Sequence, residues 1–148
     1  MYKAEAFYAG DGFYRIARDI LPDDIDDEKD DYHWFVPYIV NLTFACELFL
    51  KSLISDGDSE VRGHNLSELF CHLDEATKSQ ILHSASFDGD EQFIQKLQEI
   101  SNGFCEWRYY FEKDVSASVE IFFLDHLADE LYFIAKDHLS EKNQNKGA

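Results

Sequence analysis

The chain has 148 residues and a mass of 17.2 kDa, with 13 lysines and arginines against 30 acidic residues, so its formal net charge is −17. A hydrophobic content of 45% is too high for an intrinsically disordered chain and indicates one globular domain, residues 1–148. The charge excludes a simple polyanion binder, because nonspecific binding to nucleic acid needs clustered Lys and Arg. The same charge would repel an anionic membrane surface.

The N-terminus and the cysteines bear on the cellular compartment. The first residues lack a basic region followed by an apolar stretch, so no signal peptide is predicted. The three cysteines, Cys46, Cys71 and Cys105, lie in apolar helical patterns, which favours buried, reduced thiols over a disulfide framework. The longest mainly apolar stretch, residues 34–54, carries two charges and is therefore a poor membrane span. These features predict a cytoplasmic protein.

Helical spacing of apolar residues runs through most of the chain, which only two prolines and seven glycines interrupt. The expected helices, in chain order, span residues 2–20, 32–55, 66–73, 75–84, 91–112 and 118–141. An acidic loop at 22–31 separates the first two helices, and Asn65 and Asp74 are expected to cap the two short helices. The polar tail at 142–148 is expected to be frayed.

The second helix is apolar on nearly its whole circumference, which is typical of a helix that neighbours bury on several sides. Only a narrow strip near Asn41, Ala45 and Ser52 is expected to face water. The first helix is expected to place Ala6, Ala9, Phe13, Ile16, Ala17 and Ile20 along one apolar stripe. The last helix is expected to direct Val119, Phe122, Leu127, Leu131, Ile134 and Ala135 inward.

The fold class follows from this set of elements. No segment shows convincing alternation of apolar and polar residues, so no strands are predicted. Four long helices and two short ones in one domain favour an all-α fold. The economical arrangement is an antiparallel four-helix bundle, with the two short helices between its second and third long helices.

Four charged residues fall on apolar helix faces. Glu47 and Lys51 lie four residues apart on the second helix, and Arg108 and Glu112 have the same spacing on the fifth. An unpaired buried charge is costly, so such charges should find one another. We predict a network across the two helices, in which Glu47 meets Arg108 and Lys51 meets Glu112.

Three readings of this network remain open: a polar latch that sets helix register, a cation presented to an anionic ligand, and a surface that pairs with a second subunit. His64 directly precedes the Asn65 cap, where an imidazole can turn toward the helix start or a cleft. His126 and Glu130 share a helical face, but the sequence offers them no third ligand. No phosphate-binding glycine loop is present either, so we expect no metal and no cofactor.

Three segments together resemble the HEPN superfamily of small helical bundles. They read FACELFLKSLI at 44–54, GHNLSELF at 63–70 and FCEWRYYFE at 104–112. The family pattern is an Ala-x-Glu-x-x-x-Lys helix, a Gly/Thr-His-x-Leu turn and a later helix that bears an arginine. The similarity spans about residues 32–135.

The resemblance implies a homodimer or a partner-bound bundle, of the kind associated with toxin–antitoxin modules, phage defence or RNA processing. Many members are metal-independent ribonucleases, in which a histidine follows an arginine by four to six residues. Here no histidine follows Arg108, and the sequence instead resembles a branch with Arg-Tyr-x-x-Glu after a tryptophan. Without that imidazole, the usual cleavage reaction has no proton carrier.

Two functions are consistent with this pattern. The first is a non-catalytic interaction or regulatory module that dimerises or binds a partner protein, which the acidic surface would suit if that partner is basic. Its polar network or ligand site would comprise Glu47, Lys51, His64, Arg108 and Glu112. The alternative is a divergent ribonuclease, in which Arg108 stabilises the phosphate transition state and His64 moves the proton. In neither case is strong autonomous binding to nucleic acid expected.

Overall fold

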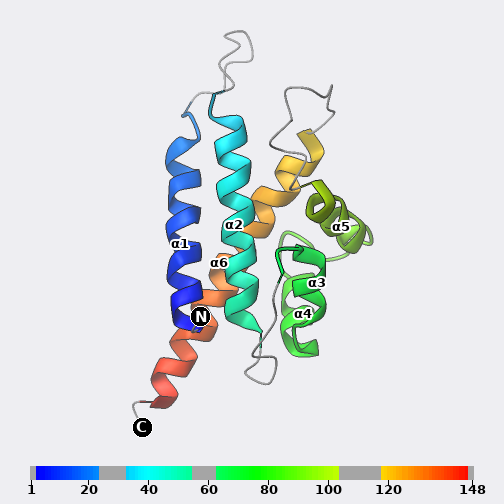
Figure 1. Ribbon diagram of the computed structural model, residues 1–148. Coiled ribbons are helices and arrows are strands. Elements are labelled where there is room, and N and C mark those ends of the chain that lie inside the picture. The colour runs from blue at the N-terminus through cyan, green and yellow to red at the C-terminus, as the bar shows by residue number, and fades with distance from the viewer. Residues whose placement is uncertain (1–2, 24–32, 55–62, 104–117, 147–148) are drawn as a thin grey trace.

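The computed structural model describes residues 3–23, 33–54, 63–103 and 118–146, and in these residues it contains α-helices and no strand (Figure 1). The helices are α1 (Lys3–Ile20), α2 (Phe35–Leu53), α3 (Leu66–Cys71), α4 (Glu75–Leu82), α5 (Phe93–Gly103) and α6 (Ser118–Lys146). The predicted all-α class is therefore confirmed. The acidic loop is described only at its start, because residues 24–31 lie outside these ranges.

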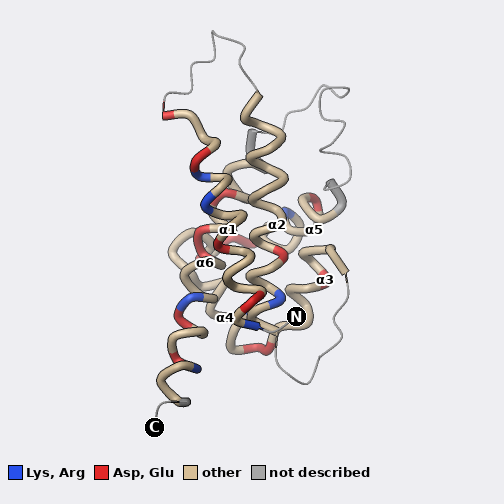
Figure 2. The backbone as a smooth tube through the Cα atoms, turned by 60° about the vertical axis from the view of Figure 1, so that its left-hand side comes forward, with Lys and Arg blue, Asp and Glu red and all other residues tan. Residues whose placement is uncertain are grey.

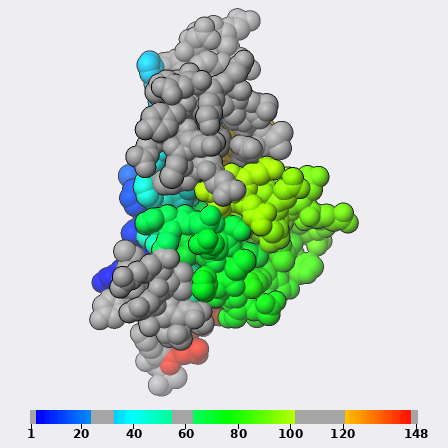
Figure 3. All heavy atoms as spheres, turned by 45° about the vertical axis from the view of Figure 1, so that its right-hand side comes forward, coloured from blue at the N-terminus to red at the C-terminus, as the bar shows by residue number. Residues whose placement is uncertain are grey.

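Helix α2 occupies the centre of the described structure. Helix α1 packs along one side of it, and α6 crosses behind both helices in Figure 1. The short helices α3 and α4 and the helix α5 form a lobe beside this core, which Figure 3 shows as one continuous block of atoms. Helix α3 joins this lobe to α2, while α4 and α5 contact α6. The predicted central position of the second helix is confirmed for the residues that α2 spans, Phe35–Leu53.

Most apolar side chains of α2 are buried in the core. Ile39, Leu42, Cys46 and Phe49 have 0% relative exposure. Each large apolar side chain buried in this way contributes about 1.5–3 kcal/mol relative to exposure in water. The expected water-facing strip is partly wrong, because Ala45 is also fully buried. Helices pack on several sides of α2, so even a small residue at the polar edge of the helix is covered.

Local signals set the starts of the two short helices as predicted, at Leu66 and Glu75, whereas α3 and α4 end two residues before the expected positions, at Cys71 and Leu82. The Asn65 side chain accepts a hydrogen bond from the backbone N–H of Glu68 at 3.1 Å. The Asp74 side chain accepts one from the backbone N–H of Thr77 at 2.7 Å. Each cap satisfies an N–H group that has no partner within its helix, and this fixes where α3 and α4 begin.

Helix α6 is longer than predicted. It continues to Lys146, whereas the sequence predicted a helix to residue 141 and a frayed tail from 142. Residues 142–146 contain neither glycine nor proline, and the first glycine after Leu139 is Gly147. Without a residue that breaks helical geometry, the exposed backbone of this polar segment continues the hydrogen-bond pattern of the helix.

Three side chains expected to be inside are exposed. Phe122 on α6 is 67% exposed and Ile16 on α1 is 48% exposed. Both belong to broad apolar stripes, and the neighbouring helices cover only part of each stripe. Cys71, which was expected to be buried, is also exposed, because it ends the short helix α3 after the inward-facing Leu69 and Phe70. Cys46 is buried as predicted, and Cys105 lies outside the described residues.

Helix α2 is the one described helix that is long and apolar enough to cross a membrane by length and composition. In the structure, 56% of this segment is buried inside the protein. A core helix meets the same criteria, and α2 packs against α1, α3 and α6.

Gly10 allows α1 and α2 to approach closely. A Cβ atom at this position would lie 2.9 Å from the Phe49 ring and 3.2 Å from the Cβ atom of Leu48. Only glycine fits this space without a shift of the neighbouring side chains. The close approach brings the charged end of α1 toward α2 and α6, where one of the two polar centres described below is formed.

Candidate functional site

Helix α2 carries only two charged residues, and they lie together. Figure 2 shows the helix almost without acidic or basic positions along its length. Glu47 is 5% exposed, and the Nζ atom of Lys51 donates a hydrogen bond to its Oε1 atom at 2.8 Å. One helical turn separates the two residues, so the α-helix itself brings the acid and the base into contact.

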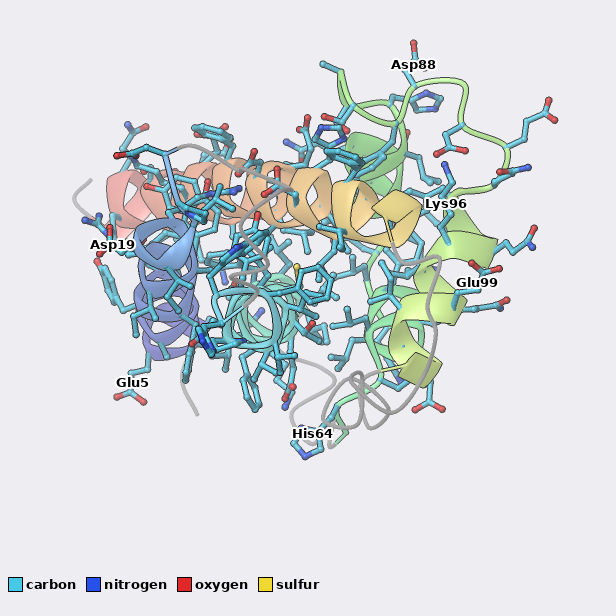
Figure 4. The ribbon with its side chains drawn as sticks, turned by 90° about the horizontal axis from the view of Figure 1, so that it is seen from above. Glu5, Asp19, His64, Asp88, Lys96 and Glu99 are labelled. Carbon is cyan, nitrogen blue, oxygen red and sulfur yellow. The ribbon has the colours of Figure 1, made fainter. Side chains whose placement is uncertain are left out.

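His64 completes this group from a distant part of the sequence. Its Nδ1 atom lies 2.7 Å from Oε1 of Glu47, although its side chain is 75% exposed. Gly63, the preceding residue, has a φ of +139°, a backbone conformation that favours glycine. Figure 4 shows His64 at the outer edge of the molecule, where its ring can meet solvent or a ligand. Glu47, Lys51 and His64 are called the Glu47 centre below.

The Glu47 centre has a defined chemistry. A carboxylate on Nδ1 of a neutral histidine accepts the Nδ1–H and leaves Nε2 as the proton acceptor of the ring. One buried carboxylate thus orients an exposed imidazole and also holds an ammonium group. Such an arrangement can position His64 for recognition of a partner or for proton transfer.

The structure brings together three of the five residues of the predicted network. The other two, Arg108 and Glu112, lie outside the described residues, so the expected pairs Glu47–Arg108 and Lys51–Glu112 stay predictions. Within the described residues, Glu47 already accepts a hydrogen bond from Lys51 and contacts the ring of His64. The Glu47 carboxylate therefore does not depend on Arg108 alone for a partner.

A second polar centre joins α1, α2 and α6, and sequence reasoning missed it. The guanidinium of Arg18 donates hydrogen bonds to Asp125 and Asp129 on α6, and to the hydroxyl of Tyr38 on α2 at 3.2 Å. The Tyr14 hydroxyl donates to Asp129 at 2.5 Å, and the Tyr38 hydroxyl donates to Asp125. These five residues are called the Arg18 centre.

Burial and charge shift the pKa values in the Arg18 centre. Burial, together with the hydrogen bond to Asp129, raises the pKa of Tyr14 to about 12. Burial and the bond to Asp125 also raise the pKa of Tyr38. Burial alone would lower the pKa of the Arg18 guanidinium, but hydrogen bonds and the charges of the two aspartates outweigh it and raise the pKa. The pKa values of Tyr14, Tyr38 and Arg18 are thus all raised, so these groups keep their protons to higher pH than in water. This is consistent with a structural role that joins the three helices.

A sequence signal for the Arg18 centre exists, although it is weak. Tyr14 and Arg18 are four residues apart on α1, and Asp125 and Asp129 are four apart on α6. Each pair lies on one helix face and borders an apolar stripe. Charges at such borders usually face water, so only the packing of α1 against α6 distinguishes this pair of acids from the many others in the chain.

No group of three or more His, Cys, Asp or Glu side chains is placed to hold a metal ion in the part of the chain that the structure describes. The predicted ligand-like pair on α6 has another contact. Glu130 accepts a hydrogen bond from the Ser86 hydroxyl at 2.7 Å, while His126 is exposed.

Comparison with known proteins adds no relative. A scan against models of protein families, a search of curated proteins and a search of solved structures each find no match to this chain. The resemblance to the HEPN superfamily therefore rests on the three sequence segments alone.

Proposed function

We propose that the protein is a non-catalytic interaction or regulatory module of the HEPN type, acting as a homodimer or with a partner protein in the cytoplasm. The observation that carries the proposal is the Glu47 centre. The Oε1 atom of Glu47 contacts two side chains at once: Lys51 from the same motif and His64 from the other motif. This contact supports reading the two motifs as one functional unit, and the resemblance links such units to toxin–antitoxin or phage-defence systems.

The proposed architecture is the antiparallel four-helix bundle expected from the sequence. The described part of α5 supports it, since Phe93, Leu97 and Ile100 are each 1% exposed. This inward face has the spacing of a helix that packs against a core. In the proposal, the helix continues beyond Gly103 and carries Arg108 and Glu112 toward the Glu47 centre.

The outer face of α6 supports a homodimer. Phe122 and Phe133 are 67% and 59% exposed, and their spacing of eleven residues, about three helical turns, puts them on one face. Two copies of α6 packed antiparallel about a two-fold axis would place each Phe122 near Phe133 of the other copy.

Light scattering after gel filtration tests the dimer. We expect twice the chain mass of 17.2 kDa, and a monomer for Phe133→Ser. Ile94→Ser is the matched control, because Ile94 is 44% exposed but lies on α5, and this variant should stay dimeric. A wild-type protein that remains monomeric at millimolar concentration would contradict the dimer, and co-purification with a partner protein would then test the other form of the proposal.

The second candidate function is a divergent ribonuclease that uses Arg108 and His64. One observation favours it: Glu47 orients the His64 ring as a general acid or base requires. An RNA cleavage assay without added metal separates the two functions. The module predicts no cleavage by the wild type. Cleavage that disappears in both His64→Ala and Arg108→Ala, with circular dichroism unchanged, would establish the ribonuclease and refute the non-catalytic module.

A further inference from the structure

His126 and Glu130 lie one helical turn apart on α6, so both side chains leave the helix on the same face. His126 is exposed and Glu130 is partly exposed. Imidazole nitrogen and carboxylate oxygen are both ligands that zinc accepts. No third such ligand joins them within the described part of one chain. A single copy therefore supplies two ligands, half of the four that a closed zinc site needs.

The pair borders the exposed apolar face of α6, which carries Phe122 and Phe133. Each residue turns the helix by about 100°, so Phe133 lies about 20° around it from Phe122. On the same scale, His126 lies about 40° and Glu130 about 80° from Phe122. In Figure 4, α6 runs along the side of the molecule opposite His64. The two ligands therefore lie on one flank of the face that the proposed homodimer would cover.

An antiparallel pair of α6 helices brings the ligands of two copies together. When Phe122 faces Phe133 of the other copy, the two-fold axis crosses the helix midway between these two positions. His126 then lies about one residue, or about 1.5 Å along the helix axis, from the level of Glu130 of the other copy. Rotation about this axis keeps both ligand pairs on the same flank of the interface. Two imidazoles and two carboxylates therefore meet beside the axis.

Hydrogen bonds distinguish Glu130 from its acidic neighbour on α6. Asp129 accepts hydrogen bonds from Tyr14 at 2.5 Å and from Arg18, so its carboxylate is held in the Arg18 centre. Glu130 accepts a hydrogen bond on its Oε1 atom from the Ser86 hydroxyl at 2.7 Å. A bond of this kind orients a carboxylate and leaves its other oxygen, Oε2, to bind a metal ion. Glu130 is therefore the better ligand of the two acids.

We propose that two copies of this chain bind one zinc ion between their α6 helices, with His126 and Glu130 of each copy as its ligands. Two imidazole nitrogens and two carboxylate oxygens form a four-coordinate set that suits zinc. The two carboxylates balance the charge of the ion, so it joins two chains of charge −17 without leaving either carboxylate unpaired at the interface. This inference rests on the homodimer proposed above.

Titration of the full-length protein, without an affinity tag, with zinc chloride tests the site. Calorimetry should show one zinc ion bound per two chains, and light scattering should show a dimer both in EDTA and in zinc. Zinc that binds only the dimer should tighten dimerisation about tenfold when free zinc is about ten times its Kd. Mg²⁺, which prefers oxygen ligands in octahedral geometry, should not compete with zinc for this site.

Variants separate the proposed ligands from other zinc-binding side chains. His126→Ala and Glu130→Gln should each weaken zinc binding by at least about tenfold, since even the loss of a group that supports a metal ligand costs about 10–100-fold. The dimer in EDTA should persist in both. His83→Ala removes a histidine that is 71% exposed, and Cys71→Ser removes the exposed thiol of α3, so these two controls should bind zinc like the wild type. Circular dichroism checks that each variant is folded.

Phe133→Ser keeps both ligands in each chain but removes a contact of the dimer, so it should lose tight zinc binding. A wild-type dimer that binds no zinc would refute the zinc site and leave the homodimer standing. A monomer in both EDTA and zinc would refute the homodimer and the zinc site together. One zinc ion per chain, or wild-type zinc affinity in Phe133→Ser or His126→Ala, would show that the ion is not held between two copies of α6.

Discussion

The Glu47 centre and the Arg18 centre each combine acidic and basic side chains, but they are built in different ways. In the Glu47 centre, the acid and the lysine lie four residues apart on one helix. In the Arg18 centre, the base lies 107 and 111 residues before its two acids and on a different helix. The Glu47–Lys51 pair therefore forms wherever α2 is helical, whereas the Arg18 centre forms only when α1, α2 and α6 are packed together.

The two centres also differ in how far their side chains are exposed to solvent. The Glu47 side chain is 7% exposed, yet its partner His64 is 75% exposed and available to other molecules. In the Arg18 centre, Arg18 and Asp125 are 28% and 26% exposed, and every member is bonded to another member. The comparison indicates that the Arg18 centre holds the helices together, while the Glu47 centre presents a side chain at the surface.

Replacing Arg18 should have the largest effect on stability. Arg18→Leu leaves the carboxylates of Asp125 and Asp129 without their cation, and the free energy of unfolding should fall by about 2–3 kcal/mol. This is less than the 3–5 kcal/mol found for fully buried pairs, because water still reaches the site. Urea unfolding measures the change.

Arg15→Leu is the control for this prediction. Arg15 pairs with Asp11 on the same helix, and its side chain is 70% exposed, so its loss should leave the urea midpoint unchanged. Equal effects of the two replacements would mean that the Arg18 centre is not a clamp between helices.

Replacing Glu47 should cost less. Glu47→Gln keeps the shape of the side chain but removes the charge that pairs with the half-buried Lys51, and we expect a loss of about 1–2 kcal/mol in urea unfolding. Glu75→Gln is the matched control, since Glu75 pairs with Lys78 at 3.3 Å but is 92% exposed. A loss above that of Arg18→Leu would reverse the ranking of the two centres.

The approach of α1 to α2 can be tested with two glycines on the same helix. Gly10→Ala gains about 0.5–1 kcal/mol of helix propensity but forces contact with Phe49, which typically costs about 1–3 kcal/mol. We expect a net loss of about 1 kcal/mol. Gly12→Ala has nothing within 4 Å of the new Cβ and should stabilise the protein by about 0.5–1 kcal/mol. Thermal unfolding of both variants measures the difference, and two shifts of the same sign would show that α1 does not lie closely on α2.

The last effect is expected only at alkaline pH. The pKa of Tyr14 is about 12 in the folded protein against 10 for an ordinary tyrosine, so the folded state holds this proton more tightly. The stabilisation is complete below pH 10 and is lost as the pH rises from 10 to 12. Tyr14→Phe should lose less stability than the wild type over this range in urea unfolding. Tyr38 shifts in the same direction, so part of the loss should remain. An equal loss in both proteins would exclude Tyr14 as a source.

Much of the candidate site could be predicted from the sequence. The contact of Glu47 with Lys51 follows from helical spacing, and the position of His64 before the Asn65 cap marked it as a residue to watch. The contact of His64 with Glu47 could not be predicted in the same way. The two residues are 17 positions apart, so only the tertiary structure decides that the ring lies beside Glu47. Arg18 was not predicted, since an arginine at the border of an apolar stripe usually reaches water.

The sequence by itself determined the all-α class, the two caps and the central position of α2, because helix periodicity and capping depend on residues within a few positions of one another. Only the tertiary structure decided that Arg18 meets Asp125 and Asp129, that Phe122 is exposed, and that a cavity remains between α1, α2 and α6. An apolar stripe tells which face of a helix can be covered. Which part of that face is covered depends on the shape of the helices packed against it, and no local pattern records that shape.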